Sequence, residues 1–213
     1  GEENEKATAI LNTWFGGTEA GDAIADVLFG DVNPSGKLPI TFPRSVGQIP
    51  IYYAHYNTGR PISKDANDNC KFEKYRSNYL DQCNTPLYPF GYGLSYTTFT
   101  ISDLKLNKVS INQNESLTAT VQLKNNGDYD GAEVVQLYIK DVFGSTVRPV
   151  RELKGFQKIF LKKGESKQVT FTIKPDDLKF YNSELKFVSE PGDFEVYVGN
   201  SSNADLTSKF TLN

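Results

Sequence analysis

The spacing of hydrophobic and polar residues changes near Thr97. After this point, short segments alternate between apolar and polar side chains with a period of two, which is typical of strands that bury one face. The alternation is clearest in residues 117–123 (LTATVQL) and 135–139 (VQLYI). Further strands are expected at 99–106, 152–161, 168–173, 194–199 and 208–212.

Glycine-containing turn sequences separate these segments. They occur at 125–128 (NNGD), 162–165 (KKGE) and 190–193 (EPGD), and residues of these types favour reversal of the chain. Short strands joined by such turns predict an antiparallel β-sandwich of two sheets. One helical turn is expected at 175–178, where two aspartates follow a proline at a favoured first position.

A different pattern precedes the sandwich. An apolar run at 9–15 (AILNTWF) stops at two glycines, as expected of a buried strand that leads into a tight turn. Apolar residues then recur at helical spacing over 18–29, with Thr18 as the expected N-cap and Gly30 as the expected C-cap. A turn (NPSG) and an extended segment at 37–42 complete one β-α-β unit of an α/β sheet. Such a unit cannot bury both of its faces by itself.

The intervening stretch has no regular period. Residues 61–86 are mostly polar, and their aromatic side chains are expected to anchor an irregular linker. Residues 87–96 (LYPFGYGLSY) contain two glycines and four aromatics, which suits a joint between the two halves. We therefore divide the chain into 1–60 (part of an α/β domain), 61–96 (linker and joint) and 97–213 (β-sandwich).

Composition and charge narrow the function classes. The 213 residues carry a formal net charge of −3 and include one histidine. Without a basic surface, nucleic acid is not expected as a partner. No apolar run approaches the roughly 20 residues of a transmembrane helix, so no membrane span is expected. The sequence contains no methionine, which predicts that it was cut from a longer chain.

Cys70 and Cys83 are the only cysteines and have 12 residues between them. A disulfide that closes a loop of this length contributes about 3 kcal/mol, whereas zinc would need two further ligands in a chain with one histidine. We predict a disulfide, with free thiols as the alternative, and therefore an exported location. No metal site is expected for the same lack of ligands. No nucleotide cofactor is expected either, since the double glycine lacks the G-x-G-x-x-G spacing of a nucleotide-binding loop.

Four stretches, in this order, resemble family 3 glycoside hydrolases. They are WFGGTEAGDAIADVLFGDVNPSGKLPITFPRSVGQIPIYY, TGRP, LYPFGYGLSYTTF and ELKGFQKIFLKKGES. The ordered set covers nearly the whole chain and is most similar to the bacterial periplasmic β-glucosidases of that family. The resemblance implies the end of an α/β sandwich domain followed by a fibronectin type III-like (immunoglobulin-like) sandwich.

The resemblance also implies a function for the longer protein. Such enzymes release β-linked glucosyl units from oligosaccharides by a retaining mechanism with two carboxyl groups. The implied nucleophile lies on an N-terminal barrel, and the implied acid/base lies in the α/β domain upstream of the glycine turn. No catalytic residue is therefore expected here, and the implied partners are the upstream barrel and α/β domains and, through them, a carbohydrate substrate.

Three residues are candidates for a position near the substrate. Glu19 follows the double glycine at the carboxyl end of the expected strand, the edge where α/β sheets bind ligands, although a helix start already accounts for a carboxylate there. Residues 55–61 (HYNTGRP) are expected to form a loop because of their Asn, Gly and Pro content. Asn57 and Arg60 lie in this loop, which by the resemblance leaves the α/β domain near the barrel. A structural salt bridge is the competing interpretation for Arg60, and a packed or surface position is expected for His55.

Two other interpretations concern the sandwich. It is a carbohydrate-binding or adhesion module if exposed aromatics such as Tyr129, Phe143 and Tyr181 stack on sugars, although core and interface packing is the expected role of most of them. It is a brace if it only supports the catalytic domains. The 213-residue piece alone is expected to lack glycosidase activity. It is also expected to cover its exposed apolar residues by self-association or to leave residues 1–60 loosely ordered.

Overall fold

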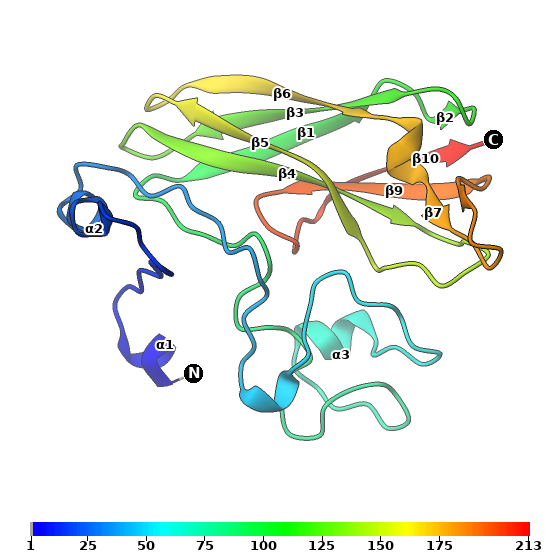
Figure 1. Ribbon diagram of the computed structural model, residues 1–213, viewed down its shortest axis with the longest axis horizontal. Helices are drawn as coiled ribbons and strands as arrows, with labels where there is room; N and C mark the ends of the chain where they lie inside the picture. The colour runs from blue at the N-terminus through cyan, green and yellow to red at the C-terminus, as the bar shows by residue number, and fades with distance from the viewer. Residues whose placement is uncertain (1) are drawn as a thin grey trace.

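The computed structural model describes residues 2–213, and its largest part is a β-sandwich (Figure 1). One sheet has the strand order β1-β3-β6, and the other has the order β2-β10-β9-β4-β5. The first sheet consists of β1 (Phe99–Leu106), β3 (Leu117–Asn125) and β6 (Ser166–Ile173). The second consists of β2 (Ser110–Ile111), β4 (Gly131–Asp141), β5 (Glu152–Leu161), β9 (Gly192–Gly199) and β10 (Leu206–Leu212).

The expected strands of the sandwich are all present, and the two-sheet architecture is confirmed. Neighbouring strands pair antiparallel, except that β2 pairs parallel with β10. Strand β2 and the hairpin of β7 (Phe180–Tyr181) and β8 (Phe187–Val188) are too short to show a period in the sequence. The 3-10 helix η2 (Pro175–Leu178) confirms the expected helical turn.

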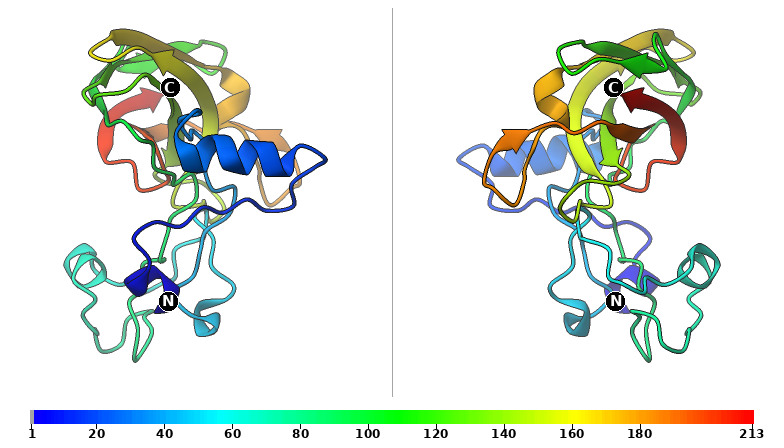
Figure 2. Two further views of the ribbon diagram at one scale, coloured as in Figure 1. Left: turned by 90° about the vertical axis from the view of Figure 1, so that its left-hand side faces the viewer. Right: turned by 90° about the vertical axis from the view of Figure 1, so that its right-hand side faces the viewer.

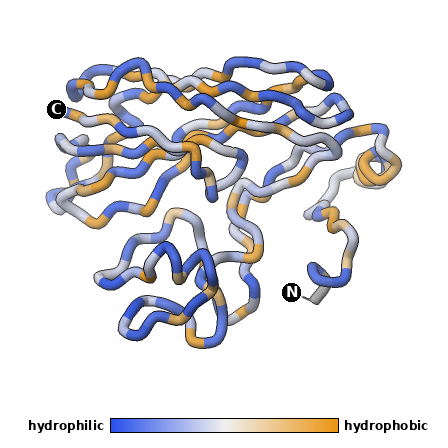
Figure 3. The backbone as a smooth tube through the Cα atoms, turned by 180° about the vertical axis from the view of Figure 1, so that it is seen from behind, coloured by the Kyte–Doolittle hydropathy of each residue, from blue (hydrophilic) through white to orange (hydrophobic). Residues whose placement is uncertain are grey.

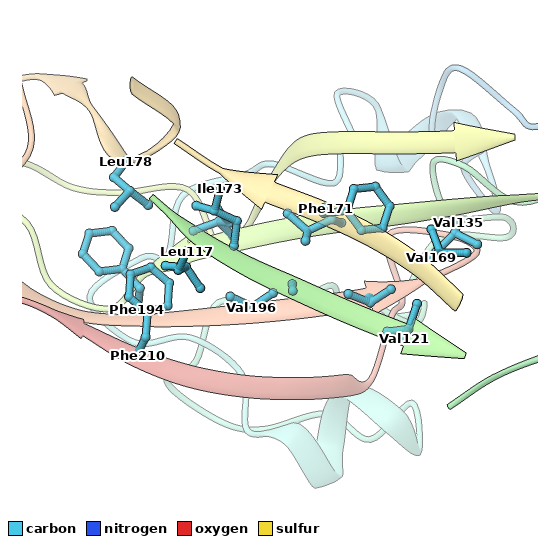
Figure 4. Close-up of a cluster of buried hydrophobic side chains, with 14 of the residues drawn as sticks. Leu117, Val121, Val135, Val169, Phe171, Ile173, Leu178, Phe194, Val196 and Phe210 are labelled. Carbon is cyan, nitrogen blue, oxygen red and sulfur yellow. The ribbon is translucent and has the colours of Figure 1, made fainter. Parts of the chain in front are cut away.

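The core of the sandwich lies between its two sheets (Figure 4). In β3, Leu117, Ala119, Val121 and Leu123 are at most 1 % exposed, and the residues between them are more exposed. Burying a side chain of leucine or valine size contributes about 1.5–3 kcal/mol. All members of this core cluster come from residues 99–212, so the sandwich builds its core from its own strands.

Residues 2–98 contain short helices and no strand, only isolated bridges. The helices are α1 (Glu2–Lys6), α2 (Ala20–Phe29), η1 (Val46–Gln48) and α3 (Lys64–Asp68). Figure 2 shows α2 beside the sandwich and the remaining segments extending below it. Within residues 2–213, no helix has the length and apolar character needed to cross a membrane.

The strand expected at 9–15 does not form. This segment is irregular and has no ladder partner among the described residues, and Ile10, Trp14 and Phe15 are exposed. A strand requires a neighbour that takes up its backbone N–H and C=O groups, and residues 2–213 provide none. The extended segment expected at 37–42 is likewise not a strand, because Phe42 forms only an isolated bridge with Tyr88.

The expected helix is confirmed as α2, but it begins later than expected. Glu19 occupies the N-cap position instead of Thr18, and no side chain makes a capping hydrogen bond there. Gly30 has a φ of 86° and ends the helix in the left-handed conformation, so the expected glycine C-cap is confirmed.

Residues 87–96 connect the N-terminal part to the five-stranded sheet. The Leu38 N–H donates to the Tyr92 carbonyl and the Gly91 N–H donates to the Leu38 carbonyl, both at 2.8 Å. Gly91 has a φ of 78°, and a Cβ there would lie 2.2 Å from Oε1 of Gln136 in β4. The positive φ therefore favours glycine, and a Cβ would also displace the carboxamide of Gln136.

A buried ion pair reinforces the same connection. Lys37 Nζ lies 2.7 Å from Glu133 Oε1, and the two side chains are only 11 % and 6 % exposed. The Lys37 ammonium also donates to the Gly93 carbonyl at 2.7 Å. Because Glu133 belongs to β4, this pair fixes the irregular part of the chain to the sandwich.

Candidate functional site

Residues 57–60 form a short exposed loop that carries two of the three candidate residues. The side chains of Asn57 and Arg60 are exposed, and neither makes a hydrogen bond or an ion pair within the described part of the chain. The salt bridge considered for Arg60 is therefore not formed there. A free guanidinium and a free carboxamide offer several N–H donors and one acceptor in planar arrangements, which suits recognition of hydroxyl groups.

The chain enters this loop along the sandwich. The Tyr53 ring stacks on Phe90 at 4.5 Å and meets Tyr138 of β4 edge-on at 5.7 Å. The Tyr53 hydroxyl accepts a hydrogen bond from the Leu153 N–H at 3.2 Å. Beside Leu153, the register of β4 and β5 shifts by one residue, and such a bulge leaves one residue unpaired in the ladder.

The residues after Tyr53 pair with the connection between β4 and β5. The Val150 N–H donates to the His55 carbonyl at 2.9 Å, and Tyr56 forms an isolated antiparallel bridge with Pro149. His55 is exposed, and its ring contact is with the neighbouring Tyr56 carbonyl at 3.2 Å. The backbone that leads into the loop is thus attached to the sandwich.

The chain leaves the loop along a second surface. The Ser77 N–H donates to the Arg60 carbonyl at 2.8 Å, and the hydroxyl oxygens of Thr58 and Ser77 are 2.6 Å apart. Pro61 forms an isolated parallel bridge with Ser77. The loop is therefore held at both ends, while its two candidate side chains remain free to contact a ligand.

Ser77 belongs to a loop that a disulfide closes. Cys70 and Cys83 are bonded, with Cα atoms 4.6 Å apart, so the structure joins the pair named from the sequence. The buried Gln48 donates to the Cys83 carbonyl at 2.7 Å and fixes the end of this loop. The loop also lines a pocket of about 370 Å³ whose walls include Phe72, Tyr79 and Leu80.

The third candidate, Glu19, stands apart from this loop. It precedes α2, which Figure 1 shows at the left beside the sandwich, whereas α3 lies below the sandwich. No hydrogen bond or ion pair joins Glu19 to Asn57 or Arg60 among residues 2–213. The structure therefore brings Asn57 and Arg60 together on one loop and leaves Glu19 in a separate position.

Large apolar side chains are exposed on α2 and on the segment before it. Figure 3 shows hydrophobic residues along the backbone of α2. Phe15 is fully exposed, Phe29 is 85 % exposed, and α2 has no buried residue. Large exposed apolar patches are unusual on soluble monomers and are typical of binding surfaces. We call Ile10, Trp14, Phe15, Leu28 and Phe29 the N-terminal apolar residues.

A charged network lies on the outer face of the five-stranded sheet. Glu195 is 3.1 Å from Lys140 and 3.0 Å from Lys209, and it accepts a hydrogen bond from the Tyr197 hydroxyl at 2.5 Å. Burial alone would raise the pKa of Glu195, but the bonds from Tyr197, Lys209 and Lys140 outweigh it and lower this pKa to about 2. Burial and the Glu195 carboxylate raise the pKa of Tyr197 to about 12. A carboxylate held this firmly in its charged form stabilises the sheet and is unsuited to donating protons.

Tyr129, Phe143 and Tyr181 are all exposed on the sandwich. None of the three therefore lies in the core of the sandwich, while packing at an interface with another part of the enzyme stays an expectation. The Tyr181 ring lies 5.0 Å from the ring of Phe187 across the β7–β8 hairpin. The described residues include no group of three or more His, Cys, Asp or Glu side chains that could hold a metal ion.

Sequence reasoning did not identify the residues that hold the 57–60 loop. Tyr53 ends an apolar run at 49–53 (IPIYY), which is the one sequence feature that suggests a packed side chain. The sequence does not reveal its partner, because Leu153 is 100 positions away. Ser77 lies in a polar segment with no distinguishing pattern. Contacts between distant segments of irregular structure are not encoded in local periodicity.

Comparisons with known proteins place these features in a family context. The model of the glycosyl hydrolase family 3 C-terminal domain matches residues 1–96, and that of a fibronectin type III-like domain matches residues 133–202. A periplasmic beta-glucosidase of Salmonella typhimurium is 56 % identical over 211 residues, which cover 99 % of this chain and 27 % of that protein. A beta-xylosidase of Formosa agariphila is 47 % identical over 94 % of this chain and 26 % of that protein.

A solved structure has the same fold throughout. The crystal structure of a beta-glucosidase from Listeria innocua in complex with glucose matches with a TM-score of 0.92 and 45 % identity. The match covers 100 % of this chain and 29 % of the other. The chain thus spans a little over a quarter of the length of these relatives.

Proposed function

Because the chain belongs to glycoside hydrolase family 3, we propose that it is part of an enzyme that releases β-linked glucosyl or related units from oligosaccharides. The observation that carries this proposal is the 56 % identity to a periplasmic beta-glucosidase across 99 % of the chain. Related sugars are included because another relative at 47 % identity is a beta-xylosidase.

The proposed reaction is retaining hydrolysis by two carboxyl groups about 5 to 5.5 Å apart. One attacks the anomeric carbon to give a covalent glycosyl-enzyme, while the other protonates the leaving oxygen and later activates water. We assign neither carboxyl group to this chain. Its 213 residues are therefore expected to be inactive alone and to support an active site built elsewhere in the enzyme.

The support proposed for residues 1–60 is completion of the α/β domain. In the whole enzyme, residues 9–15 would join a sheet as the strand that their apolar pattern indicates, and α2 would cover part of that sheet. This arrangement explains why 9–15 has no ladder partner and why the N-terminal apolar residues are exposed. Residues 61–96 would then be the linker and joint, and 97–213 the sandwich that braces the catalytic domains.

Two of the candidate residues are proposed to contact sugar hydroxyls directly. Arg60 presents a planar fork of N–H donors, and Asn57 offers both a donor and an acceptor. Together they suit sugar hydroxyl groups, which both donate and accept hydrogen bonds. Their side chains have no competing partners in the described residues. Glu19, at the turn into α2, is retained as a third substrate-proximal residue that acts from its separate position.

We also propose that the protein is exported. The Cys70–Cys83 disulfide is of a kind that persists in oxidising compartments and is rare in the cytosol. The relative with 56 % identity is described as periplasmic, which supports the same location.

The test is to assay the full-length enzyme and the 213-residue chain side by side on an aryl β-glucoside and an aryl β-xyloside. Hydrolysis is expected only from the full-length enzyme. Turnover by the 213-residue chain well above a blank would show that a catalytic pair lies within it. Failure of the full-length enzyme to cleave either glycoside would refute the proposed activity.

A sugar-binding sandwich is the second candidate, and the exposed pair of Tyr181 and Phe187 favours it. Calorimetric titration of residues 97–213 with β-glucan oligosaccharides separates the two roles. Binding that Tyr181→Ala abolishes supports the binding module. Absence of heat at millimolar sugar supports a bracing role.

A further inference from the structure

We propose that the sandwich sets the conformation of the 57–60 loop and that Tyr53 is the positioning residue through which it does so. The proposal rests on the proposed function, in which Asn57 and Arg60 contact the sugar. It assigns the sandwich a part in substrate binding without requiring that the sandwich touch the substrate.

The first support is the geometry of the loop ends. On one side, the His55 carbonyl accepts from the Val150 N–H at 2.9 Å; on the other, the Arg60 carbonyl accepts from the Ser77 N–H at 2.8 Å. Only four residues lie between these attachments, so the backbone of the loop has little freedom left. The exposed side chains on it therefore start from a restricted set of positions.

The second support is the position of Tyr53. Its ring is in contact with Tyr138, which is 0 % exposed, and its hydroxyl binds the Leu153 N–H at the bulge of β5. Bulges of this kind redirect backbone groups beside functional sites. Tyr53 thus attaches the irregular segment that contains His55 and the loop to the paired strands β4 and β5.

The third support is the second attachment surface. Ser77 lies inside the loop closed by the Cys70–Cys83 disulfide, whose end is fixed by Gln48. The 57–60 loop is thus held between two restrained parts of the chain. A binding group ordered before the ligand arrives loses less conformational entropy on binding, so loosening either side should weaken substrate binding more than the chemical step.

The experiment measures kcat and KM of the full-length enzyme on an aryl β-glucoside for Tyr53→Leu and Tyr53→Phe. Tyr53→Leu removes the ring and the hydroxyl, and KM is expected to rise about tenfold with kcat nearly unchanged. Tyr53→Phe keeps the ring and should restore most of the affinity, with a rise of about threefold. The matched control is Tyr52→Leu, which alters a neighbouring exposed tyrosine and should leave KM unchanged.

A double-mutant cycle with Arg60→Ala separates positioning from general destabilisation. If Tyr53 acts through the loop, Tyr53→Leu should raise KM much less in the Arg60→Ala background than in the wild type. Equal factors in both backgrounds, or a lowered Tm with unchanged KM, would overturn the proposal. If Tyr53→Leu yields no folded enzyme, the same cycle is measured with Tyr53→Phe, and its effects on KM in the two backgrounds are compared in the same way.

The outcomes also distinguish this proposal from the proposed function. If Arg60→Ala raises KM but neither Tyr53 variant does, the sandwich does not position the loop, and the proposed function stands. If Arg60→Ala leaves KM unchanged, the loop does not contact substrate and the positioning role falls with it, while glucosidase activity remains. An enzyme that cleaves no β-glycoside overturns both.

Discussion

Leu137 of β4 and Leu28 of α2 are the same residue type in one chain, yet the first is 1 % exposed and the second 64 % exposed. Leu137 belongs to a core whose members all come from residues 99–212. Leu28 lies in a helix with no buried residue. The comparison shows that an apolar pattern specifies a face to be buried, while the position of its partners decides whether burial is achieved within these residues.

The largest expected effect on stability comes from replacing Leu137, the buried leucine. Leu137→Ala removes a leucine side chain from a closed core and should lower the free energy of unfolding of the sandwich by about 2–5 kcal/mol. The matched control is Leu28→Ala, which removes the same atoms from an exposed site. It should change the free energy of unfolding by less than about 0.5 kcal/mol. Urea unfolding of the 213-residue chain measures both, and equal losses would contradict the comparison.

The ion pair between the two regions gives the next effect. Lys37→Ala leaves the Glu133 carboxylate, 6 % exposed, without its charged partner, and should cost about 3 kcal/mol. Lys163→Ala is the control, because the Lys163–Asp128 pair is more than 60 % exposed on both sides and should contribute little to stability. Thermal unfolding of both variants tests this order. A smaller loss of stability for Lys37→Ala than for Lys163→Ala would show that the Lys37–Glu133 pair does not couple the two regions.

A pH effect follows from Glu195. Its pKa is about 2 in the fold and 4.5 as the ordinary value. Because the folded pKa is the lower one, the carboxylate stabilises the sandwich above about pH 4.5, and this contribution is lost as the pH falls towards 2. After allowance for its partial exposure, the loss should be about 1–2 kcal/mol.

The pH effect is measured as the difference in unfolding free energy between pH 6 and pH 3. Glu195→Gln should reduce that difference, whereas Glu184→Gln, in a pair about two-thirds exposed on both sides, should not. An unchanged pH dependence in Glu195→Gln would contradict the assignment.

The smallest effect concerns the N-terminal apolar residues. The 213-residue chain should self-associate weakly through them, and replacing Phe15 and Phe29 by serine should lower the associated fraction at a given concentration. Light scattering over a dilution series measures this, with Phe156→Ser as a control that changes an exposed phenylalanine of the sandwich. A strictly monomeric wild-type chain would show that these residues do not attract one another.

The two regions also differ in how far their sequence predicted their structure. In β3, the alternation of Leu117 to Leu123 identified the strand because its partners β1 and β6 lie in the same chain. The same type of reasoning failed at 9–15, where the apolar run was real but no neighbouring strand is present in residues 2–213. Apolar periodicity reports a preference for burial, and hydrogen-bond partners decide whether a strand forms.

The candidate site was predictable in part for a related reason. The Asn, Gly and Pro content of 55–61 correctly indicated a loop. The structure adds that residues 57–60 are exposed, which leaves the side chains of Asn57 and Arg60 free. The supports of the loop were not predictable, because Tyr53 meets Leu153 and Thr58 meets Ser77 across irregular segments. Only the Cys70–Cys83 pair carried a chemical signal of proximity.

Residues 9–15 form no strand within 2–213, and we attribute this to partner strands that are proposed to lie elsewhere in the enzyme. Hydrogen–deuterium exchange of peptides covering residues 9–29, in the 213-residue chain and in the full-length enzyme, tests it directly. The account predicts fast exchange at 9–15 in the 213-residue chain and strong protection in the full-length enzyme, with β3 protected in both. Equal exchange at 9–15 in the two proteins, whether fast or slow, would contradict it.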